Sequence, residues 1–277
     1  MNIFLTGATG YLGSALRSTL VSAGHEVTSL VRDPAKAATI PGAVVGDMRD
    51  RETVRRLAAA ADAVVATATP GDESSAAADT DFVDAVLAGL APGRTFLRTG
   101  GSWVHGSGDD ITEETPLDPP ALVAWRLPLD ARVLAAPGIR SMLIEPGIVY
   151  GHGGGIPNLV VGAGGRLIGP GTQHWCTIHV DDLTALYLAV LERGTTGARY
   201  LAVSGDNPTV REIGEAAHGR VEPEDPAATV ARLGDFGAAL LLDQQAGGGR
   251  ARQELSWKPT RPSLVEEIGA GGYAPRV

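Results

Sequence analysis

A glycine-spaced turn directly after an apolar run is the feature that most constrains this chain. The apolar run Ile3–Leu5 predicts a strand, and the segment TGATGYLG that follows has glycines at positions 7, 10 and 13. The first glycine permits a tight exit from a strand, the second lets the backbone approach a pyrophosphate, and the third lets a helix pack closely on a sheet. An amphipathic stretch near Tyr11–Ala23 supplies that helix, and its N-terminal amides would face the phosphates. The turn therefore predicts a dinucleotide site that includes Gly7, Thr9, Gly10, Tyr11, Leu12 and Gly13.

Short apolar runs alternate with amphipathic stretches along the first two-thirds of the chain, a pattern typical of a parallel sheet covered by helices. We therefore predict an α/β fold with a Rossmann-type doubly wound parallel sheet and a smaller C-terminal substrate-binding lobe. The dinucleotide domain should cover residues 1–150, and the lobe mainly residues 151–277, with residues around 176–203 returning to the first domain. Expected strands lie near residues 27–31, 43–45, 63–66, 95–97, 141–144 and 200–203, and expected helices near 51–60, 79–88, 124–135, 181–192, 209–218 and 233–242.

Basic residues after the second predicted strand favour NADP(H) over NAD(H). NAD-binding proteins usually place an acidic residue there, where it accepts a hydrogen bond from the ribose 2′-hydroxyl. This chain instead has Arg32, with Lys36 one turn later, and both could pair with a 2′-phosphate. Asp33 keeps NAD(H) open as the less favoured cofactor, because its side chain could turn inward.

Other residues expected around the cofactor follow the next three strands. A carboxylate after the third strand could accept from the adenine amino group, and small residues after the fourth would leave room for the nicotinamide half. The predicted contacts are Asp47, Met48, Ala66, Thr67, Ala68, Thr99 and Gly100.

Charge and composition exclude several classes of function. The net charge is −9 and no basic run occurs, so we expect no nucleic-acid partner. We expect no membrane span and no signal peptide, and hence a cytoplasmic protein. With a single cysteine, Cys176, neither an intrachain disulfide nor a thiolate metal cluster is expected, and no metal site is predicted. Both a monomer and a homodimer are compatible with the sequence.

Three later motifs complete a resemblance to a known superfamily. They are PGIVYG at residues 146–151, IHVDD at 178–182 and ELSWKP at 254–259. Together with the glycine turn, these motifs resemble the extended short-chain dehydrogenases/reductases, the epimerase/dehydratase-like branch, over almost the whole chain. The resemblance implies that Pro146, Gly147 and Ile148 lie beside the nicotinamide and that the C-terminal third binds substrate.

The catalytic triad of that superfamily is missing from this chain. The family places a serine after the fifth strand and then Tyr-x-x-x-Lys on the next helix. Here Gly101 stands at the serine position, and the best match of the helix puts Trp125 in place of the tyrosine and Leu129 in place of the lysine. No lysine occurs between residues 36 and 258, and no tyrosine between residues 11 and 150, so the Tyr–Lys pair cannot exist in any register.

Chemistry without the triad leaves three functions open. The first is an NADPH-dependent ketoreductase, with protonation assisted by the substrate or by water, which resembles the triad-lacking reductases that tailor aromatic polyketides. The second is an NADP(H)-binding redox sensor or scaffold, and the third a nucleotide-sugar epimerase or dehydratase. Candidate proton donors are Ser102, His105 and Tyr150, and the residues expected to line a flat, apolar substrate pocket are Ser102, Trp103, Trp125 and Tyr150.

Overall fold

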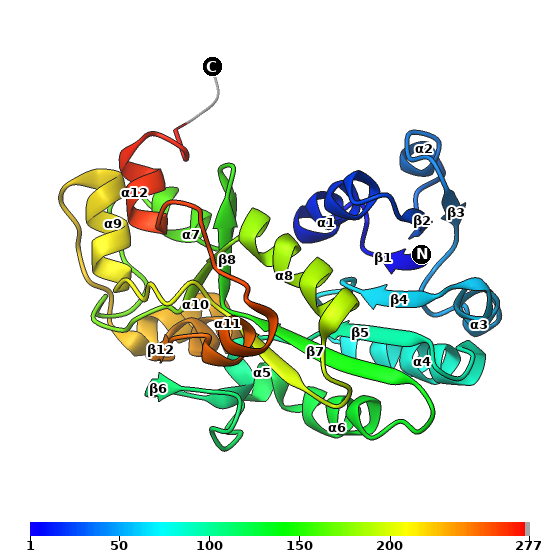
Figure 1. The fold of residues 1–277 in the computed structure, drawn as a ribbon. Coiled ribbons are helices and arrows are strands. Elements are labelled where there is room, and N and C mark those ends of the chain that lie inside the picture. Colours follow the sequence, from blue (N-terminus) through cyan, green and yellow to red (C-terminus); the bar gives the residue numbers. More distant parts are fainter. Residues whose placement is uncertain (275–277) are drawn as a thin grey trace. The chain divides into compact units, whose positions relative to one another are not determined.

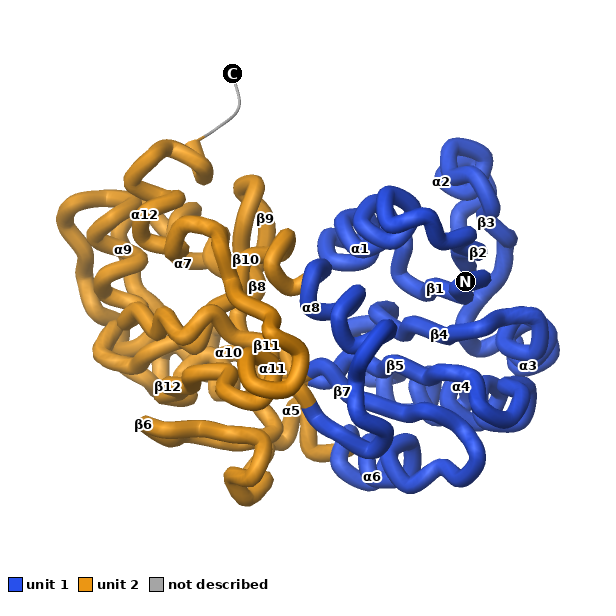
Figure 2. The backbone as a smooth tube through the Cα atoms, viewed as in Figure 1, with its two compact units in different colours: residues 1–100, 126–144, 184–199 blue, residues 101–125, 145–183, 200–277 orange. Residues whose placement is uncertain are grey.

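The computed structural model describes residues 1–274 and shows two compact units that the chain enters more than once (Figure 2). Unit 1 comprises residues 1–100, 126–144 and 184–199, and unit 2 comprises residues 101–125, 145–183 and 200–277. The division differs from the expected boundary in two respects. Residues 101–125 belong to unit 2, which is about as large as unit 1, and the segment returning to unit 1 is 184–199 rather than 176–203.

A seven-stranded sheet in the order β11-β7-β5-β4-β1-β2-β3 organises the fold (Figure 1). The pairs from β7 across to β3 are all parallel, which confirms the predicted doubly wound sheet. The first strand pairs with both the second and the fourth, so the strand order reverses beside it, and ligands of such sheets bind at this point. The strands are β1 Asn2–Thr6, β2 Glu26–Val31, β3 Ala43–Val45, β4 Ala63–Ala66, β5 Thr95–Thr99, β7 Arg140–Pro146 and β11 Arg199–Ala202.

Helices form a layer on each face of this sheet. Helix α3 packs on α4 and α4 on α6, whereas α1 and α8 are joined by a 2.9 Å hydrogen bond between the hydroxyls of Thr19 and Thr184. Local sequence explains α3, because Asp50 caps its first turn and the buried Val54, Leu57 and Ala58 form one apolar stripe. The helices are α1 Tyr11–Ser22, α2 Pro34–Ala37, α3 Arg51–Ala60, α4 Ser75–Gly89, α6 Arg126–Leu134 and α8 Val180–Arg193.

The helix expected near residues 124–135 is divided in two. A short helix, α5, spans Ala121–Ala124, and α6 begins at Arg126 after a break at Trp125. Pro128 therefore falls in the first turn of α6, where a backbone amide has no acceptor within the helix and proline is tolerated.

Unit 2 has its own hydrophobic core and two small sheets, one of three strands and one of two. The buried side chains of Tyr150, Trp175 and Leu240 lie in one hydrophobic cluster with residues of α9, α10 and α12. The glycine-rich segment 151–171 contains β9 and α7, and α10 begins earlier than expected, with a break at Gly234. The elements are η1 Ser102–His105, β6 Gly108–Ile111, β8 Ile148–Gly151, β9 Gly154–Gly155, α7 Asn158–Val161, β10 Thr177–His179, α9 Val210–His218, α10 Pro226–Leu240, β12 Gln244–Ala246, α11 Gly249–Leu255 and α12 Leu264–Gly269.

Within residues 1–274, no helix combines the length and the apolar character that crossing a bilayer requires.

Candidate cofactor site and the predicted catalytic residues

The turn between β1 and α1 is a backbone cradle that only glycine permits. Gly7 has a φ of +80°, and a Cβ at Gly13 would lie 2.0 Å from the carbonyl oxygen of Gly7. The amide of Gly10 donates to that same oxygen at 2.8 Å, which closes the turn. Helix α1 begins immediately after Gly10, which has no side chain to cap the first amides. The amides of this first turn can therefore bind an anionic group, and the cradle fits the pyrophosphate of a dinucleotide.

A cavity of about 320 Å³ opens at this turn, at the carboxyl ends of β1, β2 and β4. It lies where the strand order of the sheet reverses, as expected for a nucleotide site. We call it the larger cavity. Of the predicted cofactor residues, it is lined by Gly7, Thr9, Gly10, Tyr11, Leu12, Gly13, Arg32, Asp47, Met48, Thr67 and Ala68.

One corner of the larger cavity carries two arginines. Arg32 follows β2, and Arg49 extends from the loop after β3, where its guanidinium forms a two-point contact with Asp47 at 3.1 Å for each bond. That hydrogen bond lowers the pKa of Asp47, so its carboxylate stays charged and holds Arg49 in position. Sequence reasoning missed Arg49, although its place two residues after the predicted Asp47 was the available signal.

The structure does not bring Lys36 to this corner. Lys36 lies exposed on α2 and lines neither the larger cavity nor the smaller one described below. Asp33 does not turn inward either, because its carboxylate accepts the amide of Ala35 at 2.8 Å and caps α2. Of the charged residues after β2 that the sequence singled out, only Arg32 faces the larger cavity.

A smaller cavity of about 110 Å³ lies at the carboxyl ends of β4 and β5. It shares Thr67, Ala68 and Thr69 with the larger cavity, and its remaining lining residues are Ala66, Asp79, Phe82, Arg98, Thr99, Gly100 and Arg126. The strand ends are tied together here: the hydroxyl of Thr99 donates to the carbonyl of Ala66 at 2.6 Å and accepts from Tyr187 at 2.5 Å. The smaller cavity thus adds three predicted cofactor residues to those that line the larger one: Ala66, Thr99 and Gly100.

Charged side chains that sequence reasoning missed stand beside this smaller cavity. Arg98 is buried between Asp79, at 2.9 Å, and Asp130, at 2.8 Å. Burial raises the pKa of Asp79, against the influence of the neighbouring arginines. Arg126 is half-buried, with Nη1 3.5 Å from the carbonyl oxygen of Thr99, whereas Leu129, expected at the family's lysine position, is buried.

The candidate donors Ser102 and His105 lie in the interior of unit 2. The Ser102 hydroxyl donates to Gln244 at 3.1 Å, and the Gln244 amide returns a bond to the Ser102 carbonyl at 2.9 Å. His105 Nε2 lies 3.2 Å from Glu145 with both side chains buried, and within residues 1–274 its Nδ1 has no hydrogen-bond partner. Ser102 is therefore held by the side chain of Gln244, and His105 lies in a buried contact with Glu145.

The aromatic candidates are also engaged within unit 2. Tyr150 is 1% exposed, and its hydroxyl donates to the carbonyl of Pro262 at 2.7 Å; burial raises the pKa of this phenol. Half-buried Trp103 makes an edge contact with Phe236, and the indole of Trp125 donates to the Leu122 carbonyl at 3.1 Å. Tyr150 is therefore a poor proton donor, and the contact of these side chains with substrate stays a prediction.

The predicted nicotinamide contacts Pro146, Gly147 and Ile148 lie in unit 2. Gly147 is required there, because a Cβ would lie 2.3 Å from the carbonyl oxygen of Cys176. Their contact with a cofactor also stays a prediction.

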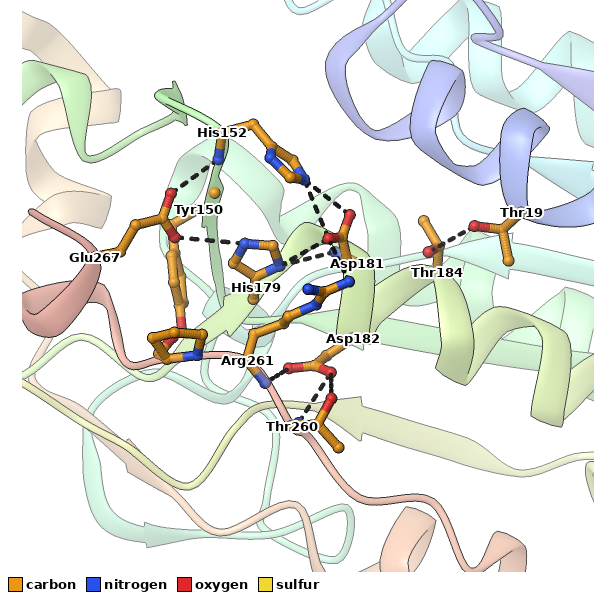
Figure 3. A network of polar contacts seen from close by, with 12 residues as sticks. Thr19, Tyr150, His152, His179, Asp181, Asp182, Thr184, Thr260, Arg261 and Glu267 are labelled. Atoms are coloured by element: carbon orange, nitrogen blue, oxygen red, sulfur yellow. Dashed lines mark hydrogen bonds and ion pairs between the residues drawn. The ribbon is translucent and has the colours of Figure 1, made fainter. Parts of the chain in front are cut away.

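A polar network gathers where β10 meets α8 (Figure 3). His152, His179 and Asp181 place ligand-type atoms within 4.8 Å of one another. However, the Asp181 amide donates to Nδ1 of His179 at 3.1 Å, and the Arg261 guanidinium lies 3.0 Å from the Asp181 carboxylate. The N-terminus of α8 and the Arg261 guanidinium already compensate the charge of this carboxylate. A cation bound to Asp181 would have to compete with Arg261. Together with Glu267, 3.4 Å from His179, these contacts indicate an ion-pair network that anchors α8 and α12.

Comparisons with known proteins agree with the geometry of the turn. Residues 7–91 match a family model described as NAD(P)H-binding. An uncharacterized protein of Schizosaccharomyces pombe is 28% identical over 99% of this chain and 100% of its own length. A 3-diazoavenalumate denitrifying reductase of Streptomyces is 28% identical over 97% of this chain and 99% of its own. A human epimerase family protein solved with NADPH shares the fold, with a TM-score of 0.78 and 23% identity over 98% of this chain and 99% of that one.

The predicted dinucleotide cofactor is thereby confirmed at the level of NAD(P)H, and the chain carries an NAD(P)H-binding domain on a fold that it shares with an epimerase family protein.

Proposed function

We propose that the chain is an NADPH-dependent reductase of a small-molecule ketone. The observation that carries the preference for NADPH is the pair of arginines, Arg32 and Arg49, in one corner of the larger cavity. A 2′-phosphate is close to a dianion at neutral pH, and planar guanidinium groups bind phosphate oxygens in two-point contacts. Asp33, the carboxylate that the sequence offered to a 2′-hydroxyl, is bound to a backbone amide and does not line the larger cavity.

The chain's own residues bind and orient the reactants in this proposal. When bound, the cofactor supplies a hydride to the carbonyl carbon of the substrate. The amides of the glycine turn hold the pyrophosphate, and the small side chains after β4 leave room for the nicotinamide half. The similarity to a reductase of Streptomyces supports reduction rather than epimerisation.

The proton for the developing alkoxide comes from outside the family's triad. Ser102, His105 and Tyr150 are each held by a partner inside unit 2, and a lost general acid costs about 10²–10⁴-fold in rate. A hydroxyl on the substrate beside its ketone, or a water molecule, offsets part of that loss. We therefore extend the proposal to flat, polycyclic aromatic polyketide ketones flanked by a phenol. The missing triad and the composition suggest this class through a resemblance to the angucyclinone ketoreductase of simocyclinone biosynthesis.

The cofactor preference is tested with Arg32→Glu, and Lys36→Ala serves as a matched control. Loss of a charge-assisted contact should weaken NADPH binding by about 10–150-fold in calorimetry while NADH binding changes little. Lys36→Ala removes a cation four residues away that lines neither cavity, so it should bind NADPH like the wild type. Equal weakening of both cofactors by Arg32→Glu would contradict the proposed 2′-phosphate site.

Reductase activity is tested by following NADPH oxidation with phenol-flanked polycyclic ketones and their O-methylated analogues. Turnover that is much slower with the methylated analogue would support protonation by the substrate. Equal rates with both would contradict substrate assistance and favour water as the donor.

A redox sensor or scaffold is the second candidate, favoured by one specific observation. All three candidate donors are buried and partnered, as expected of a chain that binds the cofactor and catalyses little. Tight NADPH binding without turnover across the ketone panel would favour this function. A nucleotide-sugar epimerase or dehydratase ranks third, because that chemistry needs efficient proton transfer and the chain lacks the tyrosine and lysine that supply it.

A further inference from the structure

The smaller cavity continues the larger one along the carboxyl edge of the sheet. The two share the segment after β4, Thr67 to Thr69, so a ligand that enters at the glycine turn can extend past β4 toward the end of β5. A dinucleotide is such a ligand, because its two nucleoside halves extend in opposite directions from the pyrophosphate. With the adenosine half held at the Arg32 corner, its other half is directed toward the smaller cavity.

Two arginines line the smaller cavity, and both lie near the carboxylates of Asp79 and Asp130. Arg98 is buried between Asp79 and Asp130 at 2.9 and 2.8 Å, so its charge is used within the core. Arg126 comes from the first residue of α6 and lies against the end of β5, 3.5 Å from the carbonyl oxygen of Thr99. Burial lowers the pKa of Arg126, as does the charge of Arg98, while Asp79 and Asp130 act in the opposite direction. Arg126 lines the smaller cavity, so a ligand bound there that carries hydrogen-bond acceptors would lie beside its guanidinium.

The start of α6 lies beside the end of β5. Helix α5 ends at Ala124 and α6 begins at Arg126, so Arg126 stands in the first turn of α6, next to the carbonyl oxygen of Thr99. Leu129, the residue matched to the family's lysine, is instead buried in the core.

We propose that the smaller cavity binds the nicotinamide-ribose half of NADPH and that Arg126 holds it by donating hydrogen bonds to its hydroxyl and carboxamide oxygens. This inference rests on the proposed NADPH-dependent function. Arg126 then supplies a fixed cation at the end of the cofactor where hydride leaves. Because a guanidinium stays protonated at any working pH, Arg126 cannot donate a proton, which assigns protonation to another group.

The test compares two ligands that share the adenosine half. Both NADPH and 2′,5′-ADP carry the 2′-phosphate, but only NADPH has a nicotinamide-ribose half, so the ratio of their dissociation constants isolates that half. In Arg126→Gln, NADPH binding should weaken by about tenfold or more, as for a lost charge-assisted bond, while 2′,5′-ADP binding stays within about twofold. The matched control is Arg132→Gln on the same helix, an exposed residue paired with Asp84, and it should leave both ligands unchanged.

Arg126→Lys keeps a positive charge beside Asp79 and Asp130. It provides a second test of the proposal if the glutamine variant does not fold. It should lower the NADPH preference over 2′,5′-ADP by about threefold, because an ammonium group donates from a single point. An unchanged ratio in Arg126→Gln overturns the proposal, and so does an unchanged ratio in Arg126→Lys if the glutamine variant does not fold. Failure of the NADPH-dependent function itself gives a different result, because the wild type would then bind neither ligand or Arg32→Glu would weaken neither.

Discussion

Replacing Gly13 with alanine should destabilise unit 1 by filling space that the phosphate turn occupies. The new Cβ would lie 2.0 Å from the carbonyl oxygen of Gly7 and 3.0 Å from Thr67 Oγ1. Restoring an ordinary contact of 3.4 Å requires the Gly7 carbonyl to move by more than 1 Å, and this oxygen already accepts the amide of Gly10. Such overpacking falls at the upper end of the usual range, about 3 kcal/mol. For a chain of this size the melting temperature should then fall by about 6–12 °C.

Gly10→Ala should weaken NADPH binding while leaving the stability of the fold almost unchanged. Its φ of −86° suits alanine, and its Cβ would meet only the Gly7 carbonyl oxygen, at 3.3 Å. The melting temperature should therefore change by only about 2 °C, a fraction of a kcal/mol. The added methyl group faces the position of the pyrophosphate, so NADPH affinity should fall by about tenfold or more, since each 1.4 kcal/mol is tenfold.

Differential scanning calorimetry without cofactor measures the change in melting temperature. Calorimetric titration with NADPH measures the change in affinity. Gly249→Ala is the control, because a Cβ there has no neighbour within 4 Å, and it should melt and bind like the wild type. A Gly13→Ala protein that melts with the wild type, or a Gly10→Ala protein that binds NADPH normally, would refute the account of the turn.

Three further substitutions test other parts of the molecule. Arg98→Met removes the cation between two buried aspartates and should lower the free energy of unfolding by about 3–5 kcal/mol, measured by urea denaturation. Glu212 accepts the amide and hydroxyl of Thr209, which lowers its pKa below 4.5; its contribution to stability is therefore complete at neutral pH and is lost as the pH falls through the lowered value. The urea midpoints of Glu212→Gln and the wild type should accordingly differ most at neutral pH and converge as the pH falls through the lowered pKa of Glu212. Tyr150→Phe removes the bond to Pro262 and should cost about 1–3 kcal/mol of stability without changing the rate of ketone reduction, whereas a large fall in that rate would identify Tyr150 as the proton donor.

Local sequence determined the sheet and the phosphate turn. Strands at Ala43–Val45 and Ala63–Ala66 and the helix Arg51–Ala60 have the predicted bounds, because apolar periodicity and an N-cap are properties of neighbouring residues. The glycine spacing at positions 7, 10 and 13 was equally decisive: Gly7 has a positive φ, a Cβ at Gly13 would meet the Gly7 carbonyl oxygen, and Gly10 leaves room for the ligand. The missing tyrosine and lysine could also be read directly from the chain.

Tertiary structure alone decided which charged and aromatic side chains face the cofactor cavities. Lys36 and Arg49 have the same charge, yet only Arg49 lines the larger cavity, because Asp47 holds it there. Arg126, the first residue of α6, reaches the end of β5, whereas Leu129, at the position matched to the family's lysine, is buried in the core. Tyr150, which sequence reasoning left as a possible donor, is buried against a segment more than a hundred residues away. Periodicity specifies the face of an element, but the packing of distant segments determines what that face meets.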